Sequence, residues 1–148
     1  MNKFASLGVN TSTSARMEII LPGEIDPLTD GAGNVAYIEF LPWDSEPGRA
    51  YDRRKTTEAV RKGFRQRSRA ELRAEAENED MAAEQAERLS ALAVGWHLVG
   101  PDKGVIDVPF SKENANELFA SPETAWLRRQ AWVYVANEAN FMKGSSKS

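Results

Sequence analysis

The stretch LAVGWHLVGPDKGVIDVPFSKENANELFASPETAWLRRQAWVYVANEANF, residues 92–141, holds three of the four tryptophans and the densest helical pattern of apolar residues. Ser111, with Glu113 in the turn that follows, predicts the N-cap of one helix. Ser121-Pro122-Glu123 repeats this signal with proline at the first helical position, and predicts a last helix over residues 122–140. A terminal helix this rich in large apolar side chains must bury them, either in its own core or against a partner.

Length and composition indicate one domain. We expect that domain over residues 17–141, with flexible tails at residues 1–16 and 142–148. Cysteine is absent, which excludes disulfides, thiolate nucleophiles and cysteine zinc sites. No apolar run approaches the roughly 20 residues of a membrane span, and no secretory signal is visible. With a net charge of −3, the composition predicts a cytoplasmic protein without a membrane contact.

The strand signals form two pairs. Residues 17–21 and 35–41 are short apolar runs on either side of Asp-Pro and Asp-Gly turn signals, and they predict an N-terminal β-hairpin with a long loop. Because two isolated strands are marginal in water, this hairpin must pack on helices. Residues 96–99 and 105–108 flank a Gly-Pro and Lys-Gly turn, and they predict a second, small hairpin.

The middle of the chain is helical in character. Residues 49–95 lack proline and carry a thin apolar stripe, which predicts one long polar helix or two, with Gly63 and residues 78–80 as candidate interruptions. The expected fold class is therefore α+β and predominantly α-helical. It consists of an N-terminal β-hairpin packed on helices, a long polar central helix and an amphipathic, aromatic C-terminal helix.

No residue pattern predicts chemistry. His97 is the only histidine, and without a second histidine or a cysteine it is best interpreted as a half-buried or surface residue beside Trp96. The carboxylates between Glu75 and Glu87 favour a solvated helix face over an acid–base pair. Gly31-Ala32-Gly33 lies between strands and does not open a helix, so it is no dinucleotide loop. We expect no enzyme, no cofactor and no metal site.

Charge is segregated along the predicted central helix. Basic residues dominate positions 49–73, and positions 74–87 hold only acidic charges. In a helix, one stripe of arginines recurs every four positions: Arg61, Arg65, Arg69 and Arg73. Nucleic-acid binding is disfavoured, because the chain is net acidic and the basic stretch has no interleaved aromatics. Three alternatives remain, namely subunit contacts through these arginines, pairing within a helical hairpin, and solvated faces.

The C-terminal helix has two interpretations. It is either the central core helix of the domain, or part of it faces an apolar helix of a partner. Burial of one large side chain is worth about 1.5–3 kcal/mol, so leaving several in water is unfavourable. The candidate partner-binding residues are Trp126, Trp132, Tyr134 and Phe141. We expect Trp96 and Phe110 to pack in the core instead.

One order of residues resembles a known family. Val94-Gly95-Trp96, a glycine-containing turn and then residues 108–114 (VPFSKEN) resemble the tail assembly chaperones of long-tailed bacteriophages and prophages. In those proteins a GW segment precedes a PFS-x-EN helix start, and a later helix ends in NF before a short Lys/Ser tail, as in residues 140–148 here. The resemblance is best from Ala93 onward, and the central helix contributes little to it.

The resemblance implies a function. It implies a non-enzymatic factor of the host cytoplasm that binds the tape measure protein and keeps it soluble until tail tube subunits polymerise. It also implies self-association, absence from the mature virion, and contact with the tail tube protein through a frameshifted, C-terminally extended product. The alternative is a structural tail or connector component that stays in the virion.

Overall fold

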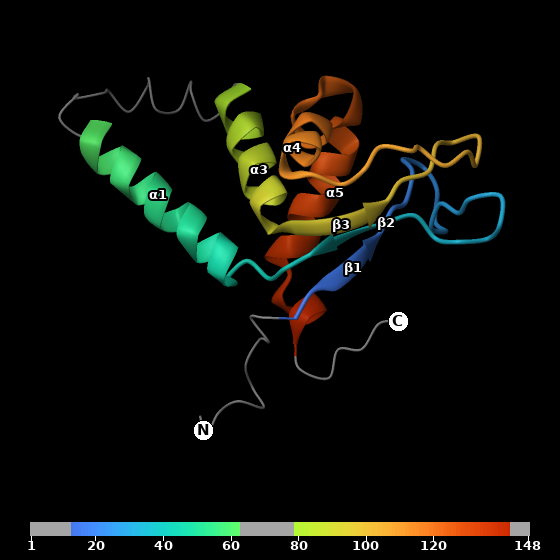
Figure 1. The fold of residues 1–148 in the computed structure, drawn as a ribbon, viewed down its shortest axis with the longest axis horizontal. Coiled ribbons are helices and arrows are strands. Elements are labelled where there is room, and N and C mark those ends of the chain that lie inside the picture. The colour runs from blue at the N-terminus through green and yellow to red at the C-terminus, as the bar shows by residue number, and fades with distance from the viewer. Residues whose placement is uncertain (1–12, 63–78, 143–148) are drawn as a thin grey trace.

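The computed structural model describes residues 13–62 and 79–142. Its strands are β1 (Ala15–Glu18), β2 (Tyr37–Phe40) and β3 (Ala93–His97), and its α-helices are α1 (Glu46–Lys62), α3 (Glu79–Leu92), α4 (Lys112–Ala120) and α5 (Ala125–Ala136). Two short 3-10 helices, η2 (Pro122–Thr124) and η3 (Glu138–Phe141), flank α5. Figure 1 shows α3, α4 and α5 packed together beside a small sheet, with α1 reaching away from them. The predicted fold class, α+β and mostly helical, is confirmed.

The sheet is antiparallel, with the order β1-β2-β3. Its first two strands are the predicted hairpin, with Met17 opposite Ile38, and β1 begins at Ala15, two positions before the expected domain start. The predicted second hairpin is reduced to a single bridge between Val99 and Val105. Its first half belongs instead to β3, where Trp96 lies opposite Ile38. By pairing with β2, β3 becomes the third strand of the sheet. A three-stranded sheet is stable when it packs on helices, whereas an isolated two-stranded ribbon is marginal in water.

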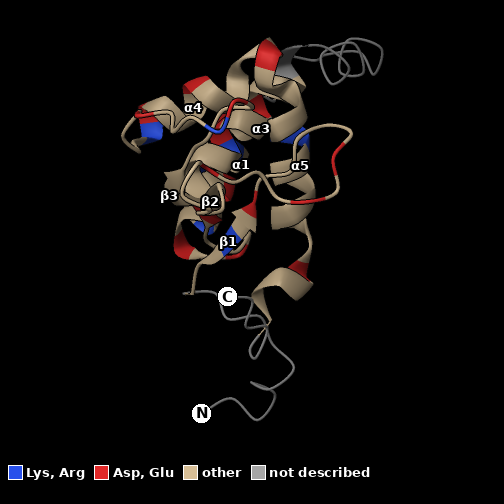
Figure 2. Cartoon of the chain, turned by 90° about the vertical axis from the view of Figure 1, so that its right-hand side faces the viewer, with Lys and Arg blue, Asp and Glu red and all other residues tan. Residues whose placement is uncertain are grey.

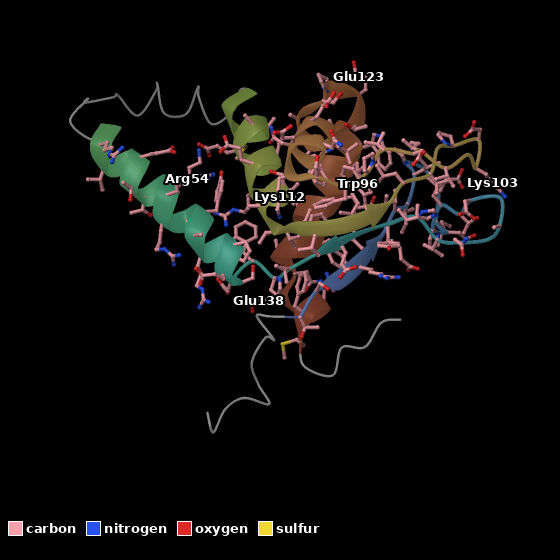
Figure 3. The ribbon with its side chains drawn as sticks, in the orientation of Figure 1. Arg54, Trp96, Lys103, Lys112, Glu123 and Glu138 are labelled. Atoms are coloured by element: carbon pink, nitrogen blue, oxygen red, sulfur yellow. The ribbon has the colours of Figure 1, made fainter. Side chains whose placement is uncertain are left out.

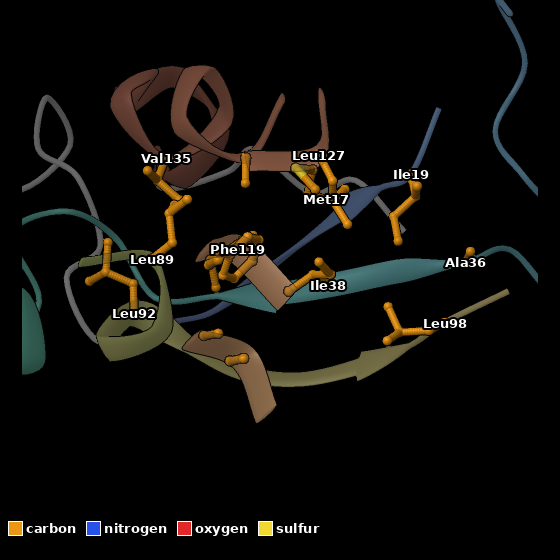
Figure 4. Packing of buried hydrophobic residues seen from close by; sticks show 14 of the residues in the cluster. Met17, Ile19, Ala36, Ile38, Leu89, Leu92, Leu98, Phe119, Leu127 and Val135 are labelled. Atoms are coloured by element: carbon orange, nitrogen blue, oxygen red, sulfur yellow. The ribbon is translucent and has the colours of Figure 1, made fainter. Parts of the chain in front are cut away.

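One face of this sheet makes the core. Met17, Ile38 and Phe40 are buried, whereas the alternating positions Arg16 and Glu18 are exposed, as expected for an antiparallel sheet with one solvated face. The helices complete the core with the buried side chains of Leu89, Leu92, Phe119, Leu127 and Val135 (Figure 4). A single continuous apolar cluster thus joins the sheet to α3, α4 and α5.

In the part of the central region that the structure describes, α1 and α3 are separate helices. The Tyr51 hydroxyl of α1 donates a hydrogen bond to the carbonyl oxygen of Glu84 in α3, at 3.1 Å. These side-by-side helices therefore do not form one straight helix. Of the two candidate interruptions, Gly63 directly follows α1 outside the described residues, and α3 begins within the second at Glu79.

The C-terminal helix starts differ from each other. The Ser111 hydroxyl accepts a hydrogen bond from the amide of Asn114 at 2.9 Å, so the predicted N-cap of α4 is confirmed. Ser121 makes no such cap, since its hydroxyl donates to the side chain of Glu123. The predicted continuous helix over residues 122–140 is also wrong. The backbone becomes extended at Asn137, whose side chain accepts a hydrogen bond from Ala139 and starts η3.

Candidate protein-binding surfaces

The aromatic residues of the C-terminal region lie at different depths. Phe141 is buried, and the Tyr134 ring contacts it edge-to-face, with 5.7 Å between the ring centroids. Burial raises the pKa of the Tyr134 phenol. Trp126 and Trp132 are half-buried and pack against the core cluster. Most of α5 therefore faces the core, and its large exposed apolar residue is Val133, which is 69% exposed.

A cluster of aromatic rings joins α5 to α1 and α3. The Trp43 ring meets the Trp132 ring edge-to-face at 5.0 Å. The Arg88 guanidinium lies 4.1 Å from the centroid of Trp43 and 4.6 Å from that of Tyr51, and it forms an ion pair with Asp52. Stacking of a guanidinium on aromatic faces is favourable when both are shielded from water. Neither Trp43 nor Arg88 was predicted from the sequence, because Trp43 lies in a proline-containing turn that has no helix or strand periodicity.

The charges of α1 and α3 pair within the chain. Arg54 and Lys55 approach the Glu87 carboxylate at 3.6 and 3.4 Å. Arg49 and Arg53 share the Glu46 carboxylate at 3.3 and 2.9 Å, and the hydrogen bond from Arg53 lowers the pKa of Glu46. Figure 3 shows Arg54 on the side of α1 that faces α3. Intrachain pairing, one of the three alternatives, therefore accounts for part of the charge pattern.

Of the four arginines predicted to contact other subunits, the structure places one. Arg61 is exposed on the last turn of α1. Arg65, Arg69 and Arg73 lie outside the described residues.

The histidine pairs with a buried carboxylate. His97 Nε2 lies 2.9 Å from Oδ2 of Asp30, and Asp30 also accepts hydrogen bonds from the backbone amides of Ala32 and Asn34. Hydrogen bonds lower the pKa of Asp30 from 3.8 to about 2. The bond from the backbone of Asn34 has the largest effect, followed by the bond from the His97 side chain. This arrangement fixes the loop between β1 and β2 to the end of β3. Its partners are turn amides, which indicates a structural role.

A strip of exposed apolar side chains begins on β3 and continues along the segment before α4. We call the set Val94, Val105, Ile106 and Val108 the apolar strip; these residues are 41–55% exposed. Beside it, the indole of Trp96, which Figure 3 labels, donates to the carbonyl oxygen of Val108 at 2.8 Å. The Trp96 ring also meets the Phe110 ring edge-to-face at 5.2 Å. Trp96 and Phe110, expected in the core, are half-buried and pack against it. The predicted second hairpin included Val105, Ile106 and Val108, and of these three only Val105 forms a bridge, with Val99.

A groove of about 880 Å³ lies between the strands and α5, and Trp96 contributes to its wall. Its walls include Tyr37, His97 and Val133. At its edge, Gln130 Nε2 donates to the carbonyl oxygen of Glu18 at 3.1 Å, and the Tyr134 hydroxyl donates to that of Arg16 at 3.2 Å. These α5 side chains cover the backbone of an edge strand, which would otherwise be free to pair with another chain.

We next consider metal sites, membrane-spanning helices and similarity to known proteins. In residues 13–62 and 79–142, no group of three or more His, Cys, Asp or Glu side chains is arranged to hold a metal ion. Nor does any helix in those ranges have the length and apolar character needed to cross a bilayer. Comparison of the chain with family models, curated proteins and solved structures finds no match. The function of this chain must therefore be inferred from its own residues and surfaces.

Proposed function

We propose that this protein is a tail assembly chaperone of a long-tailed bacteriophage or prophage. It acts without catalysis in the host cytoplasm, where it binds the tape measure protein and keeps it soluble until tail tube subunits polymerise. It self-associates, reaches the tail tube protein through a frameshifted extended product, and is absent from the mature virion.

One observation supports the proposal above the others. The residues that carry the family resemblance, Val94 to Trp96 and Val108 to Asn114, converge on one surface. Two of them, Val94 and Val108, belong to the apolar strip, and the rings of Trp96 and Phe110 pack against the core. A shared pattern that builds an exposed apolar surface suits a protein whose function is to bind another protein.

The chemistry of the client fits this surface. A tape measure protein is a long, largely helical chain that exposes apolar stripes before the tail tube encloses it, so it needs an apolar cover. The cover must also be displaceable, which favours a modest contact repeated along the client over one deep pocket. The apolar strip provides such a contact, because its four side chains are aliphatic and only partly exposed.

Co-expression with the longest predicted helical protein encoded nearby tests the proposal. We expect that protein to be insoluble alone, and to become soluble and co-elute with this chain on size-exclusion chromatography. The double variant Val105→Asp/Ile106→Asp should abolish the effect, since it puts two charges into the strip. The matched control is Ile25→Asp, which places a charge at an apolar residue that is 89% exposed in the β1–β2 loop.

Two outcomes would overturn the proposal. A client that stays insoluble or elutes alone in the presence of the parent chain contradicts the chaperone function. Mass spectrometry of purified particles then tests the alternative, because a structural tail or connector component is found in virions at stoichiometric amounts. If the strip variant and the Ile25 control both keep the client soluble, the strip is not the contact surface.

A further inference from the structure

Helix α1 presents an unpartnered basic face. Apart from Gly48, Tyr51 is the one buried residue among its described side chains. Arg49 and Arg53 are exposed and lie four positions apart, so they share one face of the helix. In Figure 1 this helix extends away from α3, α4 and α5.

The ion pairs within the chain do not neutralise this basic face. Arg49 and Arg53 share one carboxylate, that of Glu46. The face therefore keeps a net positive charge and has donors available for a second carboxylate surface.

Helix α4 presents a face of opposite charge. Ala115 and Phe119 point into the core, which leaves Glu113, Glu117 and Ala120 exposed on the other side. No ion pair to either glutamate occurs in the part of the chain that the structure describes. Figure 2 looks at the molecule from the side opposite α1 and colours the acidic residues of each element red on the ribbon.

The two faces match in spacing. Arg49 and Arg53 are separated by four residues, as are Glu113 and Glu117, and four helical residues rise about 6 Å. Between and beyond the glutamates, the exposed face of α4 carries the short side chains of Asn116 and Ala120. Short side chains allow two helix axes to approach closely enough for the arginines to reach the carboxylates.

The two faces cannot meet within one molecule, because α3 lies between α1 and α4 (Figure 1). We propose that α1 of one copy docks on α4 of a second copy, with Arg49 and Arg53 paired to Glu113 and Glu117. This contact deepens the self-association in the proposed function, although it is argued from the charges of this chain alone. Because the two faces lie on opposite sides of α3, each copy can bind one neighbour through α1 and another through α4. Such a head-to-tail contact extends into an open chain or closes into a ring.

Sedimentation velocity of the purified full chain tests this contact. At low salt, the weight-average mass should rise above the 16.4 kDa monomer as protein concentration increases. It should return to the monomer mass near 1 M salt, where the screening length falls to about 3 Å. Exposed ion pairs are individually weak, so we expect association only at high protein concentration.

Charge reversal identifies the faces. The variant Arg49→Glu/Arg53→Glu has two acidic faces, and Glu113→Arg/Glu117→Arg has two basic faces, so each should stay monomeric alone. An equimolar mixture should associate again, because each variant then finds a complementary face on the other. Arg129→Glu, at an exposed position of α5, is the matched control and should associate as the parent does.

A parent chain that is monomeric at all concentrations overturns the proposal, as does a mixture of folded variants that stays monomeric. Circular dichroism establishes folding, and the milder pairs Arg49→Gln/Arg53→Gln and Glu113→Gln/Glu117→Gln replace any variant that does not fold. No client is present in this experiment. A chain that solubilises its client but never associates refutes this contact and the proposed self-association, and leaves the binding of the tape measure protein in place. A chain that associates but fails with the client refutes the chaperone function alone.

Discussion

At the scale of single residues, the backbone around Gly48 leaves no room for a side chain at that position. It lies in the first turn of α1, and a Cβ atom built there would be 1.9 Å from the carbonyl oxygen of Trp43. Gly48→Ala must therefore displace the backbone, and we expect it to lower the free energy of unfolding by about 1–3 kcal/mol or more. Urea denaturation measures this change. The control is Gly95→Ala in β3, where an added Cβ meets no atom within 4 Å and should cost little.

Asp30 makes stability depend on pH in the acid range. Its pKa is lowered from 3.8 to about 2 in the folded protein by hydrogen bonds, so the unfolded chain binds this proton more readily. The stabilisation is fully present above pH 3.8 and is lost as pH falls through about 2. In Asp30→Asn, stability should therefore fall less steeply over that interval, as measured by thermal unfolding at several pH values. A variant as steep as the parent would show that other carboxyl groups cause the acid dependence.

At the scale of elements, α1 is attached to the molecule through Tyr51. That ring is 4% exposed, its hydroxyl bonds to α3, and the Arg88 guanidinium stacks on it. Tyr51→Ala removes burial worth about 1.5–3 kcal/mol, so amide exchange in α1 should become roughly ten- to hundredfold faster. Hydrogen exchange read by mass spectrometry should show no comparable change in α4 and α5. Val60→Ala, on an exposed position of the same helix, should leave exchange unchanged.

Local signals predicted the elements better than they predicted the contacts between them. The Ser111 cap, the β1–β2 hairpin and the helices α1 and α3 all depend on neighbouring residues, and the structure contains each of them. The third strand and the ring cluster around Trp43 depend on residues far apart in sequence, so no periodicity indicates them. The apolar strip was missed for a related reason. A short apolar segment such as residues 105–108 predicts a strand whether or not a second strand pairs with it.

At the scale of the whole molecule, one core determines global stability. Phe119 is fully buried where α4 meets the sheet, 6.1 Å from the ring of Phe40. Phe119→Ala should cost about 3–5 kcal/mol, a large part of the 5–15 kcal/mol typical of domains, and should lower the urea midpoint by about 1–3 M. Every probe should report the same transition, unlike the local change expected for Tyr51→Ala. Circular dichroism and tryptophan fluorescence recorded together measure this, and separate transitions would contradict a single core.

The junction between α3 and β3 has a kinetic consequence. The helix ends at Leu92 and the strand begins at Ala93, and the amide of Leu41 donates to the carbonyl oxygen of Leu92 at 2.9 Å. The last turn of α3 and the first residue of β3 therefore cannot reach their places independently. The β1–β2 hairpin closes the loop between Glu18 and Tyr37 and can form first, whereas completing the sheet must close the much longer segment between Phe40 and Ala93. In refolding, the arrival of β3 beside β2 and the docking of α3 on the core should appear as one event with one rate.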